Sequence, residues 1–194
     1  MKRSLGPKTF AYPLPVWLIG TYDKANKPNI MAASWAGICC SEPPCLSVSL
    51  RKATYTFGNI LDHNAFTVNI PSDHQVEQVD YAGVVSGKKE NKFEVSGFTP
   101  IKSDVVYAPY VAECSVVIEC SLLNTVEIGL HTQFIGKILD VKVDEDVISE
   151  AGVPDIEKIK PLIFSPGKGA YYAMGAFKGK AFAIGKRLCK NKEE

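Results

Sequence analysis

Alternation of apolar and polar side chains along the chain predicts a protein built mainly from β-strands. The clearest segment is residues 45–51, in which every second side chain is apolar. A strand has a side-chain period of two, so one face of this segment belongs to the core and the other faces solvent, a ligand or a second subunit. The core face is Leu46, Val48 and Leu50, and the outer face is Ser47, Ser49 and Arg51.

Further strands are predicted at Val16–Tyr22, Asn29–Ala36, Phe66–Ile70, Ser115–Leu123 and Gln133–Val143. The first two flank a polar turn that ends at a proline, which is typical of a hairpin. In the third, Thr67 and Asn69 fall on the polar face.

Helices are predicted at three places. Residues Tyr55–Asp62 bring Phe57, Ile60 and Leu61 to one face, and Ser72–Val85 begins with the capping-box pattern Ser-Asp-His-Gln. A short piece at Asp155–Lys160 lies between prolines. Many strands with few helices favour a closed antiparallel barrel over an alternating α/β sheet.

Composition is that of an ordinary globular protein. The 194 residues are 46% hydrophobic and 22% charged, with a net charge of +1, so we expect one domain spanning 1–194 with a frayed charged tail at 190–194. Without a basic stripe we expect no nucleic-acid partner. The apolar run Val16–Ile19 is too short to span a bilayer, so we expect no membrane association and a cytoplasmic location.

The six cysteines form no CxxC pair and no histidine stands at zinc spacing, so no metal site is expected. In a reducing compartment most of them serve as small apolar fillers. A disulfide or redox role for the adjacent Cys39 and Cys40 is disfavoured because disulfide geometry is demanding.

Chemistry concentrates between Asn29 and Thr56. Small residues around Ser34 leave room for a ring system close to the backbone, and a cluster of bases and hydroxyls follows at Arg51, Lys52, Thr54 and Thr56. The cluster stands where a strand gives way to a helix N-terminus, which favours an anion. A planar phosphorylated ligand and an ordinary half-buried hairpin with a polar edge are both compatible with these residues.

The order of several motifs resembles a known family. The matching segments are Asn29–Trp35, Pro43–Pro44, Ser47–Thr56, Phe66–Pro71, the set Gly83, Ser86, Gly87, Lys92 and Phe93, and Glu127–Gly136. Together they span about residues 5 to 185 and resemble the flavin-reductase-like, FMN-binding split-barrel family, with flavoredoxins as the nearest branch.

That resemblance implies a mainly β, antiparallel Greek-key split barrel with two or three short flanking helices. It implies bound FMN, with the phosphate at Arg51, Lys52, Thr54 and Thr56. The ring and ribityl chain would lie along Ala33, Ser34, Trp35, Ala36, Ser49 and Leu50, and Gly83 would close over them. It also implies a homodimer with the cofactor near the subunit contact, and NAD(P)H as the electron donor.

His131 is the candidate catalytic residue. The sequence places it on a strand face with Glu127, opposite Val126, Ile128 and Leu130, where it would bind the nicotinamide or deliver a proton. The family carries Asp where this chain has Leu130, which removes a possible orienting carboxylate. Tyr171 and Tyr172 would either cover the ring from the C-terminal region or fill an interface, and the second interpretation is preferred.

The predicted activity is FMN-dependent transfer of electrons from NAD(P)H to free flavin or a protein acceptor. Two alternatives remain: a flavoredoxin-type carrier with little NAD(P)H oxidation of its own, and a non-catalytic flavin-binding barrel.

Overall fold

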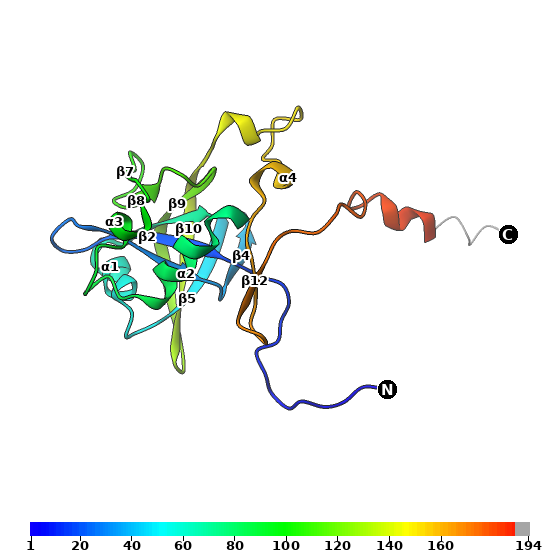
Figure 1. The fold of residues 1–194 in the computed structure, drawn as a ribbon, viewed down its shortest axis with the longest axis horizontal. Coiled ribbons are helices and arrows are strands. Elements are labelled where there is room, and N and C mark those ends of the chain that lie inside the picture. Colours follow the sequence, from blue (N-terminus) through cyan, green and yellow to red (C-terminus); the bar gives the residue numbers. More distant parts are fainter. Residues whose placement is uncertain (189–194) are drawn as a thin grey trace.

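A seven-stranded antiparallel sheet forms the body of the protein in the computed structural model, which describes residues 1–188 (Figure 1). The predicted charged tail at 190–194 lies outside the described residues. The strand order is β3-β2-β6-β9-β10-β5-β4. These strands are β2 (Trp17–Tyr22), β3 (Pro28–Ala33), β4 (Ala36–Ser41), β5 (Pro44–Arg51), β6 (Ala65–Ile70), β9 (Val116–Ile128) and β10 (His131–Val143).

The sheet curls into a barrel that stays open between its two edge strands, β3 and β4. Hairpins join β2 to β3, β4 to β5 and β9 to β10, whereas β6 returns to lie between β2 and β9. The connection from β5 to β6 therefore crosses over the β9–β10 pair, which gives the sheet its Greek-key character. Because the edge strands β3 and β4 are not paired with each other, the barrel is split. The predicted fold class is confirmed.

The barrel interior is filled by the apolar residues that the alternating pattern predicts. Leu46, Val48 and Leu50 are fully buried, and they pack with Phe66 and Phe134 in one cluster. Gly136 is required where β10 passes this cluster, because a Cβ there would lie 2.5 Å from the ring of Phe66.

Four short α-helices occur within the described residues, against the two or three predicted: α1 (Tyr55–His63), α2 (Val76–Val84), α3 (Lys92–Ser96) and α4 (Ile156–Ile159). Helix α3 was not predicted. The capping box at Ser72 and Gln75 is present, on a 3₁₀ turn (Asp73–Gln75) that leads into α2. The expectation for Leu61 was wrong, since it is 45% exposed while Ile60 is fully buried.

A second core lies between helices and the outer face of the sheet. Val79 and Ala82 of α2 and Phe93 of α3 pack there on Leu18 and Ile30 of β2 and β3. Helices α2 and α3 thereby fix the segment between them, residues 85–91, beside the start of β3, where Gly87 lies against Asn29.

The polar face predicted for β6 is not exposed. Thr67 and Asn69 are fully buried beneath the hairpin of β7 (Pro100–Lys102) and β8 (Pro109–Val111). The Thr67 hydroxyl donates to the Pro109 carbonyl at 2.6 Å, and the Asn69 amide donates to the Leu18 carbonyl at 2.9 Å. Alternation gave the right strand, but it did not reveal that a second layer covers the polar side.

The strand predicted to carry both Glu127 and His131 is a hairpin turn. Ile128 pairs with His131 across it, and Gly129 adopts a left-handed φ of 52°. Glu127 and His131 therefore belong to different strands, β9 and β10, and do not share one strand face. Leu130 is an exposed turn residue.

A small sheet of β1 (Leu14–Pro15), β11 (Ile163–Ser165) and β12 (Ala170–Tyr172) covers one end of the barrel opening. After β12 the chain leaves the body as an extended arm that ends in a 3₁₀ turn, Ile184–Leu188 (Figure 1). None of the helices within residues 1–188 is long and apolar enough to cross a membrane.

Candidate functional site

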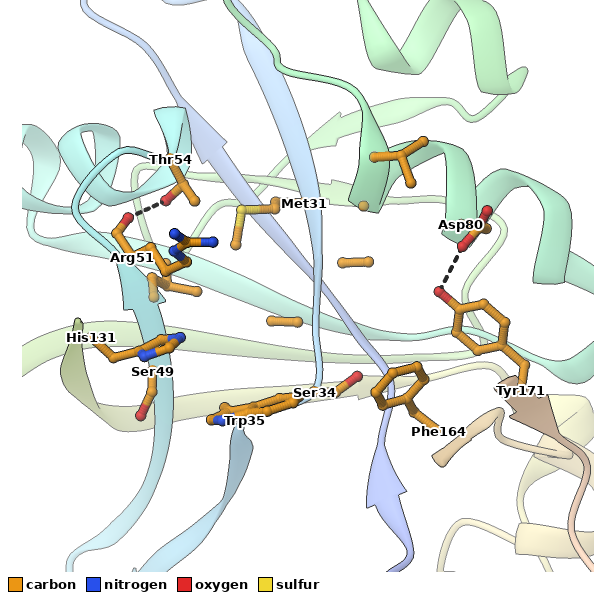
Figure 2. Close-up of a pocket in the computed structure, with 15 residues that line it drawn as sticks. Met31, Ser34, Trp35, Ser49, Arg51, Thr54, Asp80, His131, Phe164 and Tyr171 are labelled. Carbon is orange, nitrogen blue, oxygen red and sulfur yellow. Dashed lines mark hydrogen bonds between the residues drawn. The ribbon is translucent and has the colours of Figure 1, made fainter. Parts of the chain in front are cut away.

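A cavity of about 500 Å³ lies at the split of the barrel (Figure 2). We call it the main cavity. The C-terminal end of β3 forms one side of this cavity. The C-terminal end of β5 and the first residue of β10 form the other side. Its lining is Met31, Ala32, Ala33, Ser34, Trp35, Ser49, Leu50, Arg51, Thr54, Asp80, Gly83, Val84, His131, Phe164 and Tyr171.

The break between β3 and β4 creates one wall of this cavity. The sequence predicts a continuous strand over Asn29–Ala36, but β3 ends at Ala33 and β4 begins at Ala36. Ser34 and Trp35 thus lie outside both ladders. The Trp35 carbonyl accepts a hydrogen bond from the Ser49 amide at 2.8 Å, which fixes this loop to β5.

Aromatic rings supply the flat surfaces. The Trp35 indole is stacked on the His131 imidazole, with centroids 6.5 Å apart and planes 8° apart, and Phe164 approaches the same indole at 6.5 Å. Trp35 is 40% exposed, so it is not a core residue. The antiparallel register of β10 against β5, which brings His131 opposite Arg51, places both side chains at the cavity.

Tyr171 forms the opposite wall. Its hydroxyl donates a hydrogen bond to the Asp80 carboxylate at 3.0 Å, and its ring packs on Phe164 at 5.7 Å (Figure 2). Burial and the hydrogen bond to Asp80 raise the pKa of the Tyr171 hydroxyl to about 12, so it stays a donor at neutral pH. Tyr171 lines the cavity within this chain, and its part in a subunit interface stays a prediction.

A second cavity of about 310 Å³ adjoins the first, and we call it the side cavity. The two share Met31, Arg51, Thr54, Gly83 and Val84. The side cavity runs to the N-terminus of α1 and to the segment between α2 and α3. Its further lining is Ala53, Tyr55, Thr56, Val85, Ser86, Gly87 and Lys92.

Lys92 is the most unusual group at the side cavity. It is only 3% exposed, and its ammonium donates one hydrogen bond, to the Ala82 carbonyl at 2.6 Å. Burial lowers the pKa of the amine to about 8. An ammonium has three N–H donors. Within the described residues, one of the three donors of Lys92 is used, in the hydrogen bond to the Ala82 carbonyl. A buried cation with spare donors at a cavity is a candidate anion ligand.

Asn29, Thr56 and Gly87 form a tight contact behind the side cavity. The Asn29 amide donates to the Thr56 hydroxyl at 3.0 Å, while its carbonyl oxygen is buried without a partner in the described part of the chain. A Cβ at Gly87 would lie 2.0 Å from that oxygen and 2.8 Å from the Tyr55 ring. Only a glycine lets the 85–91 segment approach this closely.

The structure brings most of the predicted ligand residues together. Ala33, Ser34, Trp35, Ser49, Leu50, Arg51, Thr54, Gly83 and the catalytic candidate His131 line the main cavity, and Thr56 lines the side cavity. The Thr54 hydroxyl donates to the Arg51 carbonyl at 2.9 Å and does not cap the helix.

Two predicted residues lie elsewhere. Lys52 points away from both cavities and forms an exposed ion pair with Glu127 at 2.8 Å. Ala36 lines a neighbouring depression on the other side of Trp35, together with Phe10 and Gln133 of the chain. Alternation accounts for Lys52, because Arg51 and Lys52 are adjacent and must point in different directions at the end of a strand.

Sequence reasoning missed several cavity residues, chiefly Met31, Asp80, Val84, Phe164, Ser86, Gly87 and Lys92. Ser86, Gly87 and Lys92 belong to a matching motif, so a signal existed, but no role followed from it. Phe164 and Asp80 come from segments far apart in sequence. Nothing in their neighbourhood indicates a ligand.

A split antiparallel barrel with an aromatic-walled cavity at its opening defines the class of protein. The family model of the flavin reductase like domain matches residues 9–173. The chain belongs to this flavin-reductase-like family.

Among solved structures, the protein is similar to flavoredoxin of Desulfovibrio vulgaris (Miyazaki F), with 54% identity, a TM-score of 0.92 and coverage of 96% of this chain and 100% of that one. It is also similar to flavoredoxin from Methanosarcina acetivorans, with 32% identity, a TM-score of 0.90 and coverage of 97% and 99%. An uncharacterized protein of Archaeoglobus fulgidus is 36% identical over 147 residues, which are 76% of this chain and 81% of the relative.

Proposed function

We propose that the protein binds FMN across the two linked cavities and passes electrons through it. The observation that carries this proposal is that the main cavity, which has aromatic walls, adjoins the smaller side cavity, which is lined by the cations Arg51 and Lys92. Each volume falls within or near the range of roughly 300–1,000 Å³ that is typical of ligand pockets. Family membership supports a flavin as the ligand.

The phosphate end of the ligand fits the side cavity. Arg51 and Lys92 supply two cations there, and the first turn of α1 contains no acidic residue and presents free backbone N–H groups. A phosphate bound between them would satisfy the spare donors of Lys92. The Ser86 hydroxyl and the hydroxyl oxygen of Thr54 line the same space.

The ring end fits the main cavity. Ala32 and Ala33 leave space beside the backbone, Trp35 and Phe164 supply aromatic surface, and the Ser34 loop offers backbone groups outside the β-ladders. Bound FMN would supply hydride acceptance and electron release, chemistry that no side chain here provides. His131 would hold or donate a proton at an imidazole nitrogen beside the cavity.

NAD(P)H is the proposed electron donor, and free flavin or an electron-transfer protein is the proposed acceptor. The proposal includes a homodimer with the FMN near the subunit contact, which fits the exposure of Trp35 at the edge of the cavity. A cytoplasmic location accompanies it. Cys39, Cys40, Cys45, Cys114 and Cys120 are free thiols, which fits a reducing compartment.

A flavoredoxin-type carrier is the second candidate, favoured by the 54% identity to a flavoredoxin and by Leu130 at the turn before His131. Such a carrier would bind FMN equally well but would accept electrons from a protein faster than from NAD(P)H. Anaerobic addition of NADH or NADPH separates the two: bleaching of the flavin within seconds supports the reductase, and a persistent yellow colour supports the carrier.

The binding proposal has a direct test. We expect the purified protein to show flavin absorption bands and to release FMN on denaturation. A colourless protein that takes up no FMN when it is supplied would refute the proposal and also the second candidate.

The phosphate assignment needs a variant. Arg51→Ala combined with Thr54→Ala should weaken FMN binding by about 2–4 kcal/mol, because charge-assisted hydrogen bonds are lost. Lys52→Ala is the matched control, since Lys52 is a neighbouring base outside the cavities. It should change the FMN dissociation constant less than about twofold. Equal losses in both variants, measured by quenching of flavin fluorescence, would contradict the assignment.

A further inference from the structure

The C-terminal arm, residues 173–188, leaves the body of the protein after β12 and projects away from it (Figure 1). Near its root, Met174–Lys178 lie beside α4 and line a depression of about 520 Å³ with Ile156, Glu157 and Lys160. Farther along, the backbone hydrogen bonds of the arm are its own, from Ile184 to Lys180 and from Lys186 to Ala183, each 3.1 Å.

The arm carries large apolar side chains into solvent. Phe177 is 67% exposed, Phe182 97% and Leu188 79%. Single exposed apolar residues are ordinary, but three within twelve residues of an arm that leaves the body are typical of an interaction segment. The arm is also basic, with Lys178, Lys180 and Lys186 and no acidic residue between 173 and 188.

A surface of complementary chemistry lies next to the root of the arm. We define the acidic shoulder as residues 139–157, which comprise the end of β10, the following 3₁₀ turn and the start of α4. It contains seven acidic residues and Lys142, and the amine of the following Lys158 donates to the carbonyls of Asp146 and Ile148 within it. Exposed apolar side chains lie among the acids: Leu139, Val141, Val153 and Ile156.

We propose that the arm of one copy, residues 179–188, lies on the acidic shoulder of a second copy, and that the exchange is reciprocal. This inference rests on the homodimer of the proposed function and adds the segment and surface that hold it together. Because the root of the arm adjoins the shoulder of its own chain, a two-fold axis close to the root would bring each arm to the other chain's shoulder. Such an isologous contact closes without leaving free ends.

The arm has a limited reach and area. Its extended part, residues 173–180, spans at most about 28 Å before the chain turns at 181–188. Each aromatic side chain buries about 150–250 Å². Phe182 on each of two arms therefore supplies roughly 300–500 Å², and an equal area is buried on the receiving surfaces. Ile184 and Leu188 add to this area, and stable complexes bury about 1,200–2,000 Å² in all.

A cross-linking experiment tests where the arm lies. Full-length ¹⁴N and ¹⁵N protein, mixed and re-equilibrated, is treated with a carbodiimide, which joins lysine amines directly to carboxylates. We expect cross-links from Lys180 or Lys186 to carboxylates of 139–157, about half of them joining a light to a heavy peptide. Cross-links found only within one isotope, or none to the shoulder, would overturn the proposal.

Sedimentation tests the contribution of the arm to association. Phe182→Ser with Leu188→Ser should raise the dimer dissociation constant at least about tenfold, because two exposed apolar side chains that the second copy would cover are removed. Leu61→Ser, an exposed apolar residue on α1, is the matched control and should leave it unchanged. An equal dissociation constant in the arm variant, or a wild-type protein that is monomeric at all concentrations, would overturn the inference.

Flavin content keeps this test separate from the proposed function. No residue of the arm lines the main or side cavity, whose linings end at Tyr171. Failure of FMN uptake by wild-type protein would count against the cofactor proposal, whereas a yellow protein with unexchanged arms would count against the arm alone.

Discussion

Replacing Lys92 by methionine should make the protein without flavin more stable and its FMN complex weaker. The side chain is almost fully buried, and its ammonium has the Ala82 carbonyl as its hydrogen-bond partner among the described residues. Methionine has a similar length and no charge, so it removes the desolvation cost while filling the same space. The same substitution removes a cation from the side cavity.

The size of the stability effect follows from the pKa. Burial lowers the pKa of Lys92 from its ordinary value of 10.5 to about 8. This difference in pKa corresponds to roughly 3 kcal/mol of destabilisation of the folded state. The full cost applies below about pH 8, where the amine is charged in the folded and in the unfolded state. Between about pH 8 and 10.5 the unfolded chain holds a proton that the folded chain has lost, so stability rises with pH and the cost disappears.

Urea unfolding of the flavin-free protein between about pH 7 and 10 measures this difference. The wild type should gain roughly 2–3 kcal/mol relative to Lys92→Met across that range. Buried Cys114 and Cys120 act in the opposite direction, because burial raises the pKa of their thiols and stability falls as unfolded thiols ionise. Both proteins contain these thiols, so their contribution cancels in the comparison.

Loss of the ammonium–carbonyl hydrogen bond will offset part of the gain at neutral pH, by about 1–2 kcal/mol. That offset does not depend strongly on pH, so the pH profile is the decisive readout. Parallel profiles for wild type and variant would refute a depressed pKa at Lys92. For FMN binding, the wild-type affinity should decline as the pH rises above 8, because the free protein then loses the cation, and the variant should lack this decline.

Three further changes test the remaining parts of the site. His131→Ala should slow flavin reduction by NADH or NADPH about tenfold or more in stopped-flow measurements while FMN stays bound; an unchanged rate would make His131 structural. Gly87→Ala should cost about 1–3 kcal/mol of stability in urea unfolding, because its Cβ meets the Asn29 carbonyl oxygen, whereas Gly58→Ala in α1 meets nothing and should be neutral or stabilising. Tyr171→Phe should speed FMN release several-fold, because the wall loses its hydrogen bond to Asp80; an equal off-rate would show that the wall does not retain the ligand.

Local patterns predicted the elements whose environment is set by their own sequence. The alternation at 45–51 specified β5 and its buried face, because a period of two leaves one consistent solution when one side is apolar. The capping box at Ser72 was also visible, since it needs residues only three apart.

Errors arose where the environment of a residue is set by distant segments. Thr67 and Asn69 look like surface residues until the β7–β8 hairpin, some forty positions later, covers them. His131 and Glu127 look like one strand face because the turn between them contains only Gly129 and Leu130. A two-residue hairpin turn interrupts the strand without the proline or polar cluster that usually marks a loop.

The candidate site divides in the same way. Its half from β3 and β5 was predictable, because small and hydroxylated residues follow one another over a single stretch of chain. The other half comes from α2, the 85–92 segment and the β11–β12 hairpin, and it meets the first half only across the split of the barrel. Lys92 shows the physical reason: a lysine in sequence reads as solvated, and only the packing of α3 against α2 reveals that its charge is buried.

The open barrel also explains why the site lies where it does. In a closed barrel each strand end would be hydrogen-bonded on both sides, and the interior would be filled by side chains. Here β3 and β4 are edges, so the backbone at Ser34 and Trp35 is free of both ladders, and the main cavity lies between β3 and β5. An edge strand left open invites pairing with another chain, and a bound ligand or a second subunit over the split removes that hazard. The proposed flavin site at the opening and the proposed association of two copies would therefore both follow from the same missing strand pair.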